Sequence, residues 1–373
     1  MRLHLHKKQP GCCKVGTHIE FLLTMQRCYV IIAINIYIGI DLYSMNRGKA
    51  MKIETGSTIG VFSPSWCITN EAPEAAARAE KYIRSRGFNV KHGKLWGKAD
   101  AYVSGSPEER ADEFNALLHD PEVRILMASV GGQVTNGMLP YIDYEYYAEN
   151  PKPVVGMSDV TALLMAIYTK TGVPTYYGSN FVTSYARLSP YRDIALKSLC
   201  DVLNFEECHK YIFPEYYSDD VIEWSQELTE EKRIPNEIIT LSGGKVTGRL
   251  IGGNLYTIGN IWGTPYMPEI RKGDILFIED TEEWACSVER TLAQLKICGV
   301  FDMIGGLIIG KCRQFQHYGT EKTYYEFIYD YLNGPNYPVL AECDFSHCAP
   351  MLTLPIGITA KLDADAQTIE LVR

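Results

Sequence analysis

From residue 51 onward, short apolar runs alternate with longer stretches that carry apolar side chains on one helical face. Apolar runs typical of strands lie at 58–63, 89–90, 124–129 and 153–156. The stretches between them predict helices at 70–86, 106–119 and 160–169. Strands that alternate with helices are typical of a parallel sheet covered on both faces, so we predict an N-terminal α/β domain over residues 51–186.

Two of these helices have clear boundary signals. Ser106 precedes Pro107 and, three residues on, Glu109, which is the pattern of a capping box with proline in the first turn. In the predicted helix at 70–86, Asn70 is a suitable N-cap and Gly87 is a suitable residue to end the helix.

The pattern weakens between residues 187 and 240, which are rich in tyrosine, proline and acidic side chains. We predict a connecting segment with loops there, followed by a C-terminal domain over residues 241–373. Its predicted strands lie near 245–250, 275–279, 306–310 and 338–341, and its clearest helix at about 287–297. The fold class is therefore two-domain α/β, with an N-terminal parallel sheet and a C-terminal mixed α/β domain.

Residues 1–50 differ in composition from the rest of the chain. They carry seven Lys and Arg against two Asp and Glu, and three of the eleven cysteines. The apolar run 29–40 follows a basic stretch, as in a signal peptide, but it has no small-residue cleavage site and is short for a membrane span. Arg47-Gly48 is compatible with the codons AGG-GGN, which resemble a ribosome-binding sequence before Met51. We predict a non-globular extension from a misassigned start codon; a membrane or export signal and a structured extension stay open.

The composition is that of a globular protein, with 46% hydrophobic and 22% charged residues. Lys and Arg number 36 against 45 Asp and Glu, and the net charge of −9 disfavours a nucleic-acid-binding surface. The eleven cysteines form no C-x-x-C pair, and their odd number cannot all be used in disulfides. We therefore predict reduced thiols and a cytoplasmic protein without a nucleic-acid or membrane partner.

Ser158 stands where a predicted strand meets a predicted helix. A serine on such a tight turn is presented to a substrate, and helix N-terminal amides beside it can stabilise an oxyanion. The motif is not a G-x-S-x-G elbow, because Val160 occupies the place of the second glycine. Taken alone, Ser158 is better explained as a helix N-cap.

Two glycine-rich turns are candidates for ligand contact. Gly131-Gly132 follows the strand at 124–129, and its backbone amides are open to a ligand, although a tight turn explains the pair more simply. Asn254 ends a Gly-Gly-Asn turn that is too short for a phosphate loop.

Glu279 and His347 are the candidate acid and base. Glu279 ends a buried strand, where a carboxylate often orients a histidine but can also cap a turn. His347 lies in a loop between predicted strands, and His317 and His119 compete with it, although His119 has the place of an exposed helix end. No His, Cys and Asp cluster has the spacing of metal ligands, so we expect no metal.

In order along the chain, these motifs resemble the serine peptidase family of the LD-carboxypeptidases and the microcin C self-immunity peptidases. The matching segments span nearly all of residues 51–373 and lie at 58–65, 131–132, 156–159, 248–254, 278–280 and 345–357. Any one of these segments is weak evidence, whereas the ordered set is specific.

The resemblance implies a catalytic triad in which Ser158 is the nucleophile, His347 the base and Glu279 the acid. It also implies an oxyanion hole made by the backbone amides of Gly132 and Asp159. The active site then lies between the two domains, and the reaction needs no metal or organic cofactor. Gly131 and Asn254 are further candidates for substrate binding, and a homodimer is an expectation from the family.

The microcin-immunity branch carries an aromatic motif whose tryptophan stacks on the nucleobase of the substrate. Trp224 stands at the corresponding place, but Glu223 and Gln226 replace the tyrosine and aspartate of the motif. We favour a peptidase that cleaves an amide in a peptidyl-nucleotide or related aminoacyl conjugate. A muropeptide LD-carboxypeptidase of cell-wall recycling is the second hypothesis, and a nucleotide-conjugate binding protein without turnover is the third.

Overall fold

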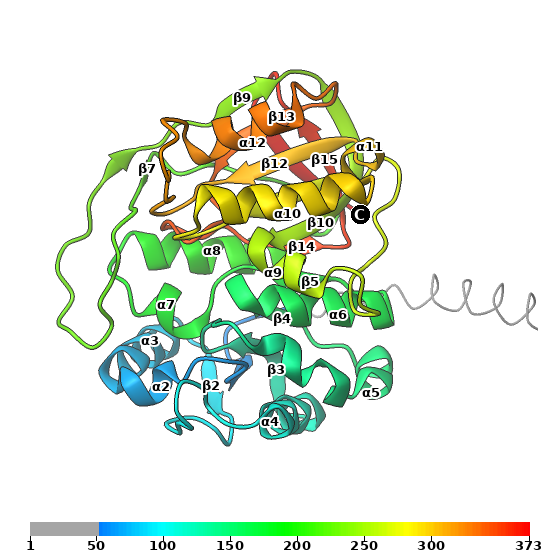
Figure 1. Ribbon diagram of the computed structural model, residues 1–373. Coiled ribbons are helices and arrows are strands. Elements are labelled where there is room, and N and C mark those ends of the chain that lie inside the picture. The colour runs from blue at the N-terminus through cyan, green and yellow to red at the C-terminus, as the bar shows by residue number, and fades with distance from the viewer. Residues whose placement is uncertain (1–51) are drawn as a thin grey trace, which may run out of the picture. The chain divides into compact units, whose positions relative to one another are not determined.

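The computed structural model of the chain describes residues 52–373, so the predictions for residues 1–50 lie outside the described residues (Figure 1). The strands and helices of its first half are β1 (Thr58–Phe62), α2 (Ile68–Glu71), α3 (Pro73–Ser85), β2 (Asn89–His92), α4 (Pro107–His119), β3 (Val123–Ala128), η1 (Thr135–Tyr141), α5 (Tyr144–Glu149), β4 (Val154–Gly156), η2 (Ser158–Val160), α6 (Thr161–Thr171), β5 (Thr175–Tyr177), α7 (Phe181–Tyr185) and α8 (Tyr191–Asn204).

The second half is richer in strands. Its elements are β6 (Cys208–Lys210), β7 (Tyr216–Tyr217), β8 (Ile234–Pro235), β9 (Ile239–Ser242), β10 (Lys245–Asn254), α9 (Leu255–Ile261), β11 (Ile275–Glu279), α10 (Ala285–Ile297), α11 (Val300–Met303), β12 (Gly306–Gly310), α12 (Tyr324–Leu332), β13 (Val339–Cys343), β14 (Leu354–Ile356), β15 (Thr359–Asp363) and β16 (Thr368–Val372).

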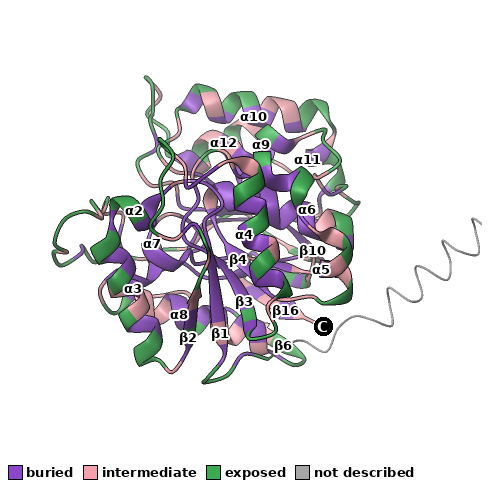
Figure 2. Cartoon of the chain, turned by 90° about the horizontal axis from the view of Figure 1, so that it is seen from below, coloured by how far each residue is buried: buried purple, intermediate pink, exposed green. Residues whose placement is uncertain are grey.

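The first sheet has the strand order β14-β5-β4-β3-β1-β2. Its neighbouring strands are parallel, except that β14 runs antiparallel to β5. Alternate side chains of these strands belong to two hydrophobic clusters. Ile59 and Val61 pack with helices α3, α7 and α8, whereas Phe62 and Leu126 pack with α4 and α6. The strands are therefore buried on both faces, as Figure 2 shows for β1, β3 and β4.

The second sheet has the order β6-β16-β15-β10-β11-β12-β13-β9 and is mixed. Strands β10 to β13 are parallel, and antiparallel strands extend the sheet on both sides. The prediction of an N-terminal parallel-sheet domain and a C-terminal mixed domain is confirmed. The chain also returns to the first sheet through β14, which the sequence analysis did not predict.

Two predicted features are wrong in detail. The single helix at 70–86 is interrupted, because Ala72 has a φ of −131° and Pro73 begins a new helix. The segment 187–240 contains the 14-residue helix α8 as well as loops. Its apolar side chains at Ala195, Leu199 and Val202 are buried at helical spacing.

Several boundaries agree closely with the sequence analysis. The capping box at Ser106 is present, with the Ser106 hydroxyl accepting a hydrogen bond from the Glu109 N–H at 3.2 Å. The strands at 275–279 and 306–310 have the predicted bounds. Within residues 52–373, no helix is long and apolar enough to cross a membrane.

Candidate active site

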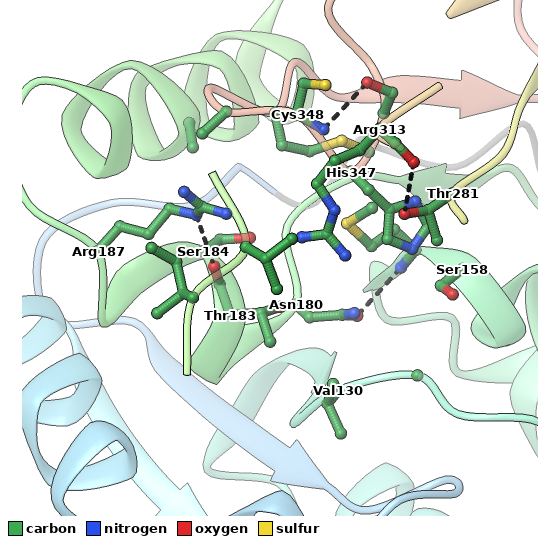
Figure 3. A pocket seen from close by; sticks show the side chains of 18 of the residues that line it. Val130, Ser158, Asn180, Thr183, Ser184, Arg187, Thr281, Arg313, His347 and Cys348 are labelled. Atoms are coloured by element: carbon green, nitrogen blue, oxygen red, sulfur yellow. Dashed lines mark hydrogen bonds between the residues drawn. The ribbon is translucent and has the colours of Figure 1, made fainter. Parts of the chain in front are cut away.

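Ser158 occupies a strained turn between β4 and α6. Its φ of +63° is rare for a residue with a Cβ and costs roughly 1–3 kcal/mol, so the surroundings must impose it. One restraint is a 3.1 Å hydrogen bond that the Ser158 N–H donates to the Tyr177 hydroxyl. Another is close packing, because a Cβ on Gly156 would lie 2.6 Å from Val160 Cγ1. The turn places Ser158 in the wall of a cavity (Figure 3).

Gly131 and Gly132 lie directly beside this turn. A Cβ on Gly131 would be 3.0 Å from Ser158 Cβ and 3.2 Å from the backbone nitrogen of Asp159. Gly132 has a φ of +147°, and a Cβ there would be 2.2 Å from Ser65 Oγ. Gly132 therefore requires glycine, and Gly131 leaves little room for a Cβ, so the glycine turn lies close against Ser158 and the Asp159 amide.

The glycine turn is held from behind by buried polar groups. The Ser65 hydroxyl accepts hydrogen bonds from the N–H groups of Gln133 at 3.0 Å and Val134 at 3.1 Å. The carboxyl group of Glu113 accepts one from the Ser63 N–H at 2.6 Å. Burial raises the pKa of Glu113 to about 7. The end of β1 and the glycine turn are thus anchored together.

The Asp159 side chain serves the fold. Its Oδ2 accepts hydrogen bonds from the Thr135 N–H at 2.8 Å and the Thr135 hydroxyl at 2.7 Å. Only 5% of the residue is exposed. The sequence analysis assigns a role to the backbone amide of Asp159 and not to its side chain. The side chain points to Thr135, and the amide stays next to Ser158 in the chain.

Glu279 and His347 form a hydrogen-bonded pair. Glu279 ends β11 and is fully buried, and its Oε2 lies 2.8 Å from His347 Nδ1. Its Oε1 accepts hydrogen bonds from the Tyr177 hydroxyl at 2.5 Å and from Asn254 Nδ2 at 3.2 Å. Tyr177 therefore contacts both Ser158 and Glu279, and it joins strand β5 of the first sheet to strand β11 of the second. This link was not predicted from the sequence, where Tyr177 is one tyrosine among 25.

The competing histidines lie elsewhere. His119 Nε2 is 3.0 Å from Asp143 on the surface, and His317 Nδ1 is 2.9 Å from the Lys322 carbonyl oxygen. Neither lines the cavity that contains Ser158 and His347.

Ser158 and His347 face the same cavity, which has a volume of about 410 Å³. Ser158 follows a strand of the first sheet, whereas His347 follows β13 of the second. Within the described part of the chain, no hydrogen bond joins Ser158 Oγ to His347. Nucleophile–base contacts are often loose without substrate, so this arrangement is compatible with acyl transfer.

Asn254 lies behind the catalytic pair. Its Nδ2 donates to Glu279 Oε1 at 3.2 Å and to Asp280 Oδ1 at 3.0 Å, and its Oδ1 accepts from the Thr257 hydroxyl at 2.8 Å. Burial and the neighbouring Glu279 charge raise the pKa of Asp280 well above its ordinary value. Asn254 does not line the cavity, so the structure places it against the two carboxyl groups rather than against a substrate.

Trp224 lies in the same cavity, on the long segment between β7 and β8 that runs down one side of the molecule in Figure 1. The Arg187 guanidinium lies 5.7 Å from the centre of its ring. Arg187 in turn forms a buried ion pair with Glu231, which comes from the same segment as Trp224. These contacts hold the segment against the cavity.

Arg313 was also missed by the sequence analysis. It follows β12 in a loop without any motif, and in Figure 3 its side chain extends into the cavity. Its Nη2 lies 2.8 Å from Glu282 Oε1. No group of three or more His, Cys, Asp or Glu side chains within residues 52–373 is arranged to hold a metal ion.

Two family models match the chain. The LD-carboxypeptidase N-terminal domain matches residues 59–178, which include Ser158, and the LD-carboxypeptidase C-terminal domain matches residues 247–362, which include Glu279 and His347. The Vibrio cholerae carboxypeptidase homologue VC_A0337 is 42% identical over 88% of this chain and 98% of its own length.

The microcin C7 self-immunity protein MccF of Escherichia coli is 40% identical over 86% of this chain and 95% of its own length. Its wild-type structure superposes with a TM-score of 0.84 and covers 86% of this chain and 97% of its own. MccF is also known in complex with glutamyl sulfamoyl guanosine and with aspartyl sulfamoyl adenosine. A muramoyltetrapeptide carboxypeptidase from Oxalobacter formigenes is 25% identical, with a TM-score of 0.68, over 84% of this chain and 98% of its own.

Proposed function

The chain belongs to the LD-carboxypeptidase family of serine hydrolases, and we propose that it hydrolyses the amide bond of a peptidyl-nucleotide or a related aminoacyl conjugate. The observation that carries this proposal is that one cavity is lined by the strained Ser158, by His347 and by Trp224, and that the buried Glu279 holds His347 from behind. A nucleophile, an oriented base and an aromatic ring for a nucleobase are the parts that such a reaction needs.

In the proposed mechanism, His347 Nε2 takes the proton of Ser158 as Ser158 Oγ attacks the amide carbonyl carbon. Glu279 holds the imidazole through Nδ1, which keeps Nε2 available as the acceptor. The N–H groups of Gly132 and Asp159 donate hydrogen bonds to the oxyanion, and each such donor stabilises it by about 3–4 kcal/mol in comparable sites. The imidazolium then protonates the leaving nitrogen, and water releases the acyl group.

The identity of the substrate is argued from the relatives and from Trp224. MccF binds aminoacyl sulfamoyl nucleosides, and it is one of the two relatives at 40% identity or above described here. Trp224 offers an indole face within the cavity, where a purine can stack. MccF is a microcin C7 self-immunity protein, and we propose that this chain likewise protects its host by hydrolysing a toxic nucleotide conjugate.

A muropeptide LD-carboxypeptidase is the second candidate. Arg313 favours it, because a guanidinium in the cavity can bind the terminal carboxylate of a D-residue. The similarity to the muramoyltetrapeptide carboxypeptidase is lower, at 25% identity.

A cleavage assay followed by mass spectrometry tests the proposal. The wild-type protein and Ser158→Ala are each incubated with aspartyl sulfamoyl adenosine and with an L,D-linked tetrapeptide muropeptide. Release of sulfamoyl adenosine by the wild type alone supports the proposed function. Release of terminal D-alanine alone supports the second candidate, and tight binding without turnover would identify a binding protein and overturn both.

A further inference from the structure

The cavity contains two arginines, and only one of them is fully neutralised. Arg187 forms an ion pair with Glu231 in which the side chains are 7% and 2% exposed. Since both partners are buried, the Arg187 guanidinium is neutralised by Glu231 and stabilises the segment that carries Trp224.

Arg313 is bound less completely. Its Nη2 contacts Glu282, whose side chain is 51% exposed at the rim of the cavity, while its Nε is buried without a hydrogen-bond partner among the described residues. An exposed carboxylate is a weak partner, because water competes for it. The Arg313 guanidinium therefore has donors to offer to a ligand.

The backbone of Arg313 is nevertheless fixed. Its carbonyl oxygen accepts a hydrogen bond of 2.8 Å from the Glu282 N–H, and Glu282 lies three residues after Glu279. Glu282 itself has a φ of +58°, so this short link is as constrained as the turn at Ser158. Arg313 is therefore positioned relative to the triad acid and does not hang freely in solvent.

Arg313 lines the same cavity as His347, Arg187 and Trp224. Burial lowers the pKa of Arg187, which contacts the Trp224 ring, and the nearby charge of Arg313 lowers it further. Burial raises the pKa of Cys348, the residue after His347, and the positive charges of Lys311 and Arg313 oppose this effect. A leaving group that extends from His347 to Trp224 lies within the cavity that Arg313 lines.

We propose that Arg313 is a specificity-determining residue that binds an anionic group of the leaving group, next to the scissile nitrogen. This inference rests on the proposed function and adds the chemistry of the linker to it. In a nucleotide conjugate the anion is the phosphoryl or sulfamoyl linker between the amide and the nucleoside; in a muropeptide it is the terminal carboxylate. Glu282 forms an ion pair with Arg313, and the anion of the substrate replaces Glu282 in this pair when it binds.

The test compares two substrates that differ only in the linker. Aspartyl sulfamoyl adenosine has an anionic linker, whereas the aspartyl amide of 5′-amino-5′-deoxyadenosine has the same acyl group and nucleoside and a neutral link. We expect Arg313→Met to lower the ratio of kcat/KM for the anionic over the neutral substrate by about 100-fold. Arg313→Lys should lower this ratio less, by about 10-fold, since lysine keeps the charge without the planar fork of the guanidinium.

Two further variants separate charge recognition from general damage. Glu282→Gln frees Arg313, so it should lower KM for the anionic substrate two- to fivefold. Arg290→Ala removes an exposed arginine of α10 outside the cavity and should leave both substrates unchanged. If Arg313→Met lowers kcat/KM equally for both substrates, Arg313 has only a structural role and the inference is wrong.

The outcome is also defined if the proposed function fails. A wild-type protein that cleaves no nucleotide conjugate is assayed with the L,D-tetrapeptide and with its C-terminal carboxamide. A preference for the carboxylate that disappears in Arg313→Met supports the inference with a peptide leaving group. The inference is overturned if Arg313→Met changes the preference for the anionic substrate in neither pair. This must hold both for turnover and for binding measured in the Ser158→Ala background.

Discussion

The two sides of the cavity are built in different ways. On the proposed catalytic side, Ser158 and Glu279 lie at strand ends, and both oxygens of the Glu279 carboxylate have partners. On the proposed recognition side, Trp224 and Arg313 lie in loops, and Val221, on the same segment as Trp224, is 52% exposed. The two sheets fix the geometry of the side that carries Ser158 and Glu279. The geometry of the side that carries Trp224 depends on a few contacts made by a long segment.

This difference matches what each side has to do. Acyl transfer needs reacting groups held at fixed distances, which buried strand ends provide. Recognition can change without disturbing the catalytic groups when it is placed on loops. The family can therefore keep one chemistry and act on different leaving groups, and variants on the two sides should fail in different ways.

The largest expected effect comes from removing the nucleophile. Ser158→Ala should lower kcat by about 10⁶-fold, the size of loss seen when a serine nucleophile is removed from a comparable triad. Ligand affinity should change little, because the Ser158 hydroxyl is not needed to hold the Trp224 segment. Turnover assays and calorimetric binding of aspartyl sulfamoyl adenosine measure the two quantities. Residual kcat above one-hundredth of the wild-type value would exclude Ser158 as the nucleophile.

Glu279→Gln should have the next largest effect. The glutamine amide can no longer fix the His347 tautomer, and kcat should fall by about 10⁴-fold. The neutral side chain also changes the partners of Tyr177 and Asn254, so thermal unfolding must be measured on the same sample. Glu283→Gln, at a position that does not line the cavity, is the matched control and should retain wild-type kcat.

On the recognition side the effect should be smaller and selective. Trp224→Ala should weaken binding of a nucleotide conjugate by about 10- to 100-fold, since stacking of a base on an aromatic ring contributes about 1–3 kcal/mol. The weaker binding should appear as an increase in KM, with kcat nearly unchanged. Trp284→Ala is the control, because Trp284 is 50% exposed and lies outside the cavity. An unchanged KM in Trp224→Ala would contradict nucleobase stacking.

The catalytic side was also the more predictable from the sequence. The turns at Ser158 and Gly131-Gly132 follow apolar runs whose ends are clear, so the turns could be located, while the roles expected of them came from the family resemblance. The two-sheet fold followed from the same alternation of strands and helices. What could not be predicted was the pairing of β14 with β5, because three residues of strand carry little pattern.

The recognition side and the links between sheets were mostly missed. Arg313 and Arg187 lie in segments without periodicity, and their importance depends on which partner neutralises each of them. Tyr177 shows the same limit, since its hydroxyl contacts Ser158 and also reaches Glu279, which lies 102 positions further along the chain. Such long-range contacts are set by tertiary packing and leave no local signal.

The smallest effect on turnover is expected at Glu113, whose carboxyl group accepts a hydrogen bond from the Ser63 N–H just after β1 and affects stability instead. Its Oε1 accepts a hydrogen bond from the Leu95 N–H at 2.7 Å, and only 1% of the residue is exposed. Burial raises the pKa of Glu113 to about 7 in the folded protein. Because this value is above that of an unfolded glutamate, the stabilisation is fully present below about pH 4.3 and is lost as the pH rises through about 7.

The free energy of unfolding should therefore fall by about 2–4 kcal/mol between pH 4.3 and pH 8 through this one group. Glu113→Gln should be less stable at low pH by about 1–3 kcal/mol, since one acceptor is lost, but its stability should lack this part of the pH dependence. Urea unfolding at both pH values measures the difference, with Asp112→Asn on the exposed face of α4 as the control. Parallel pH profiles for the wild type and Glu113→Gln would show that Glu113 does not titrate between these values and would contradict this prediction.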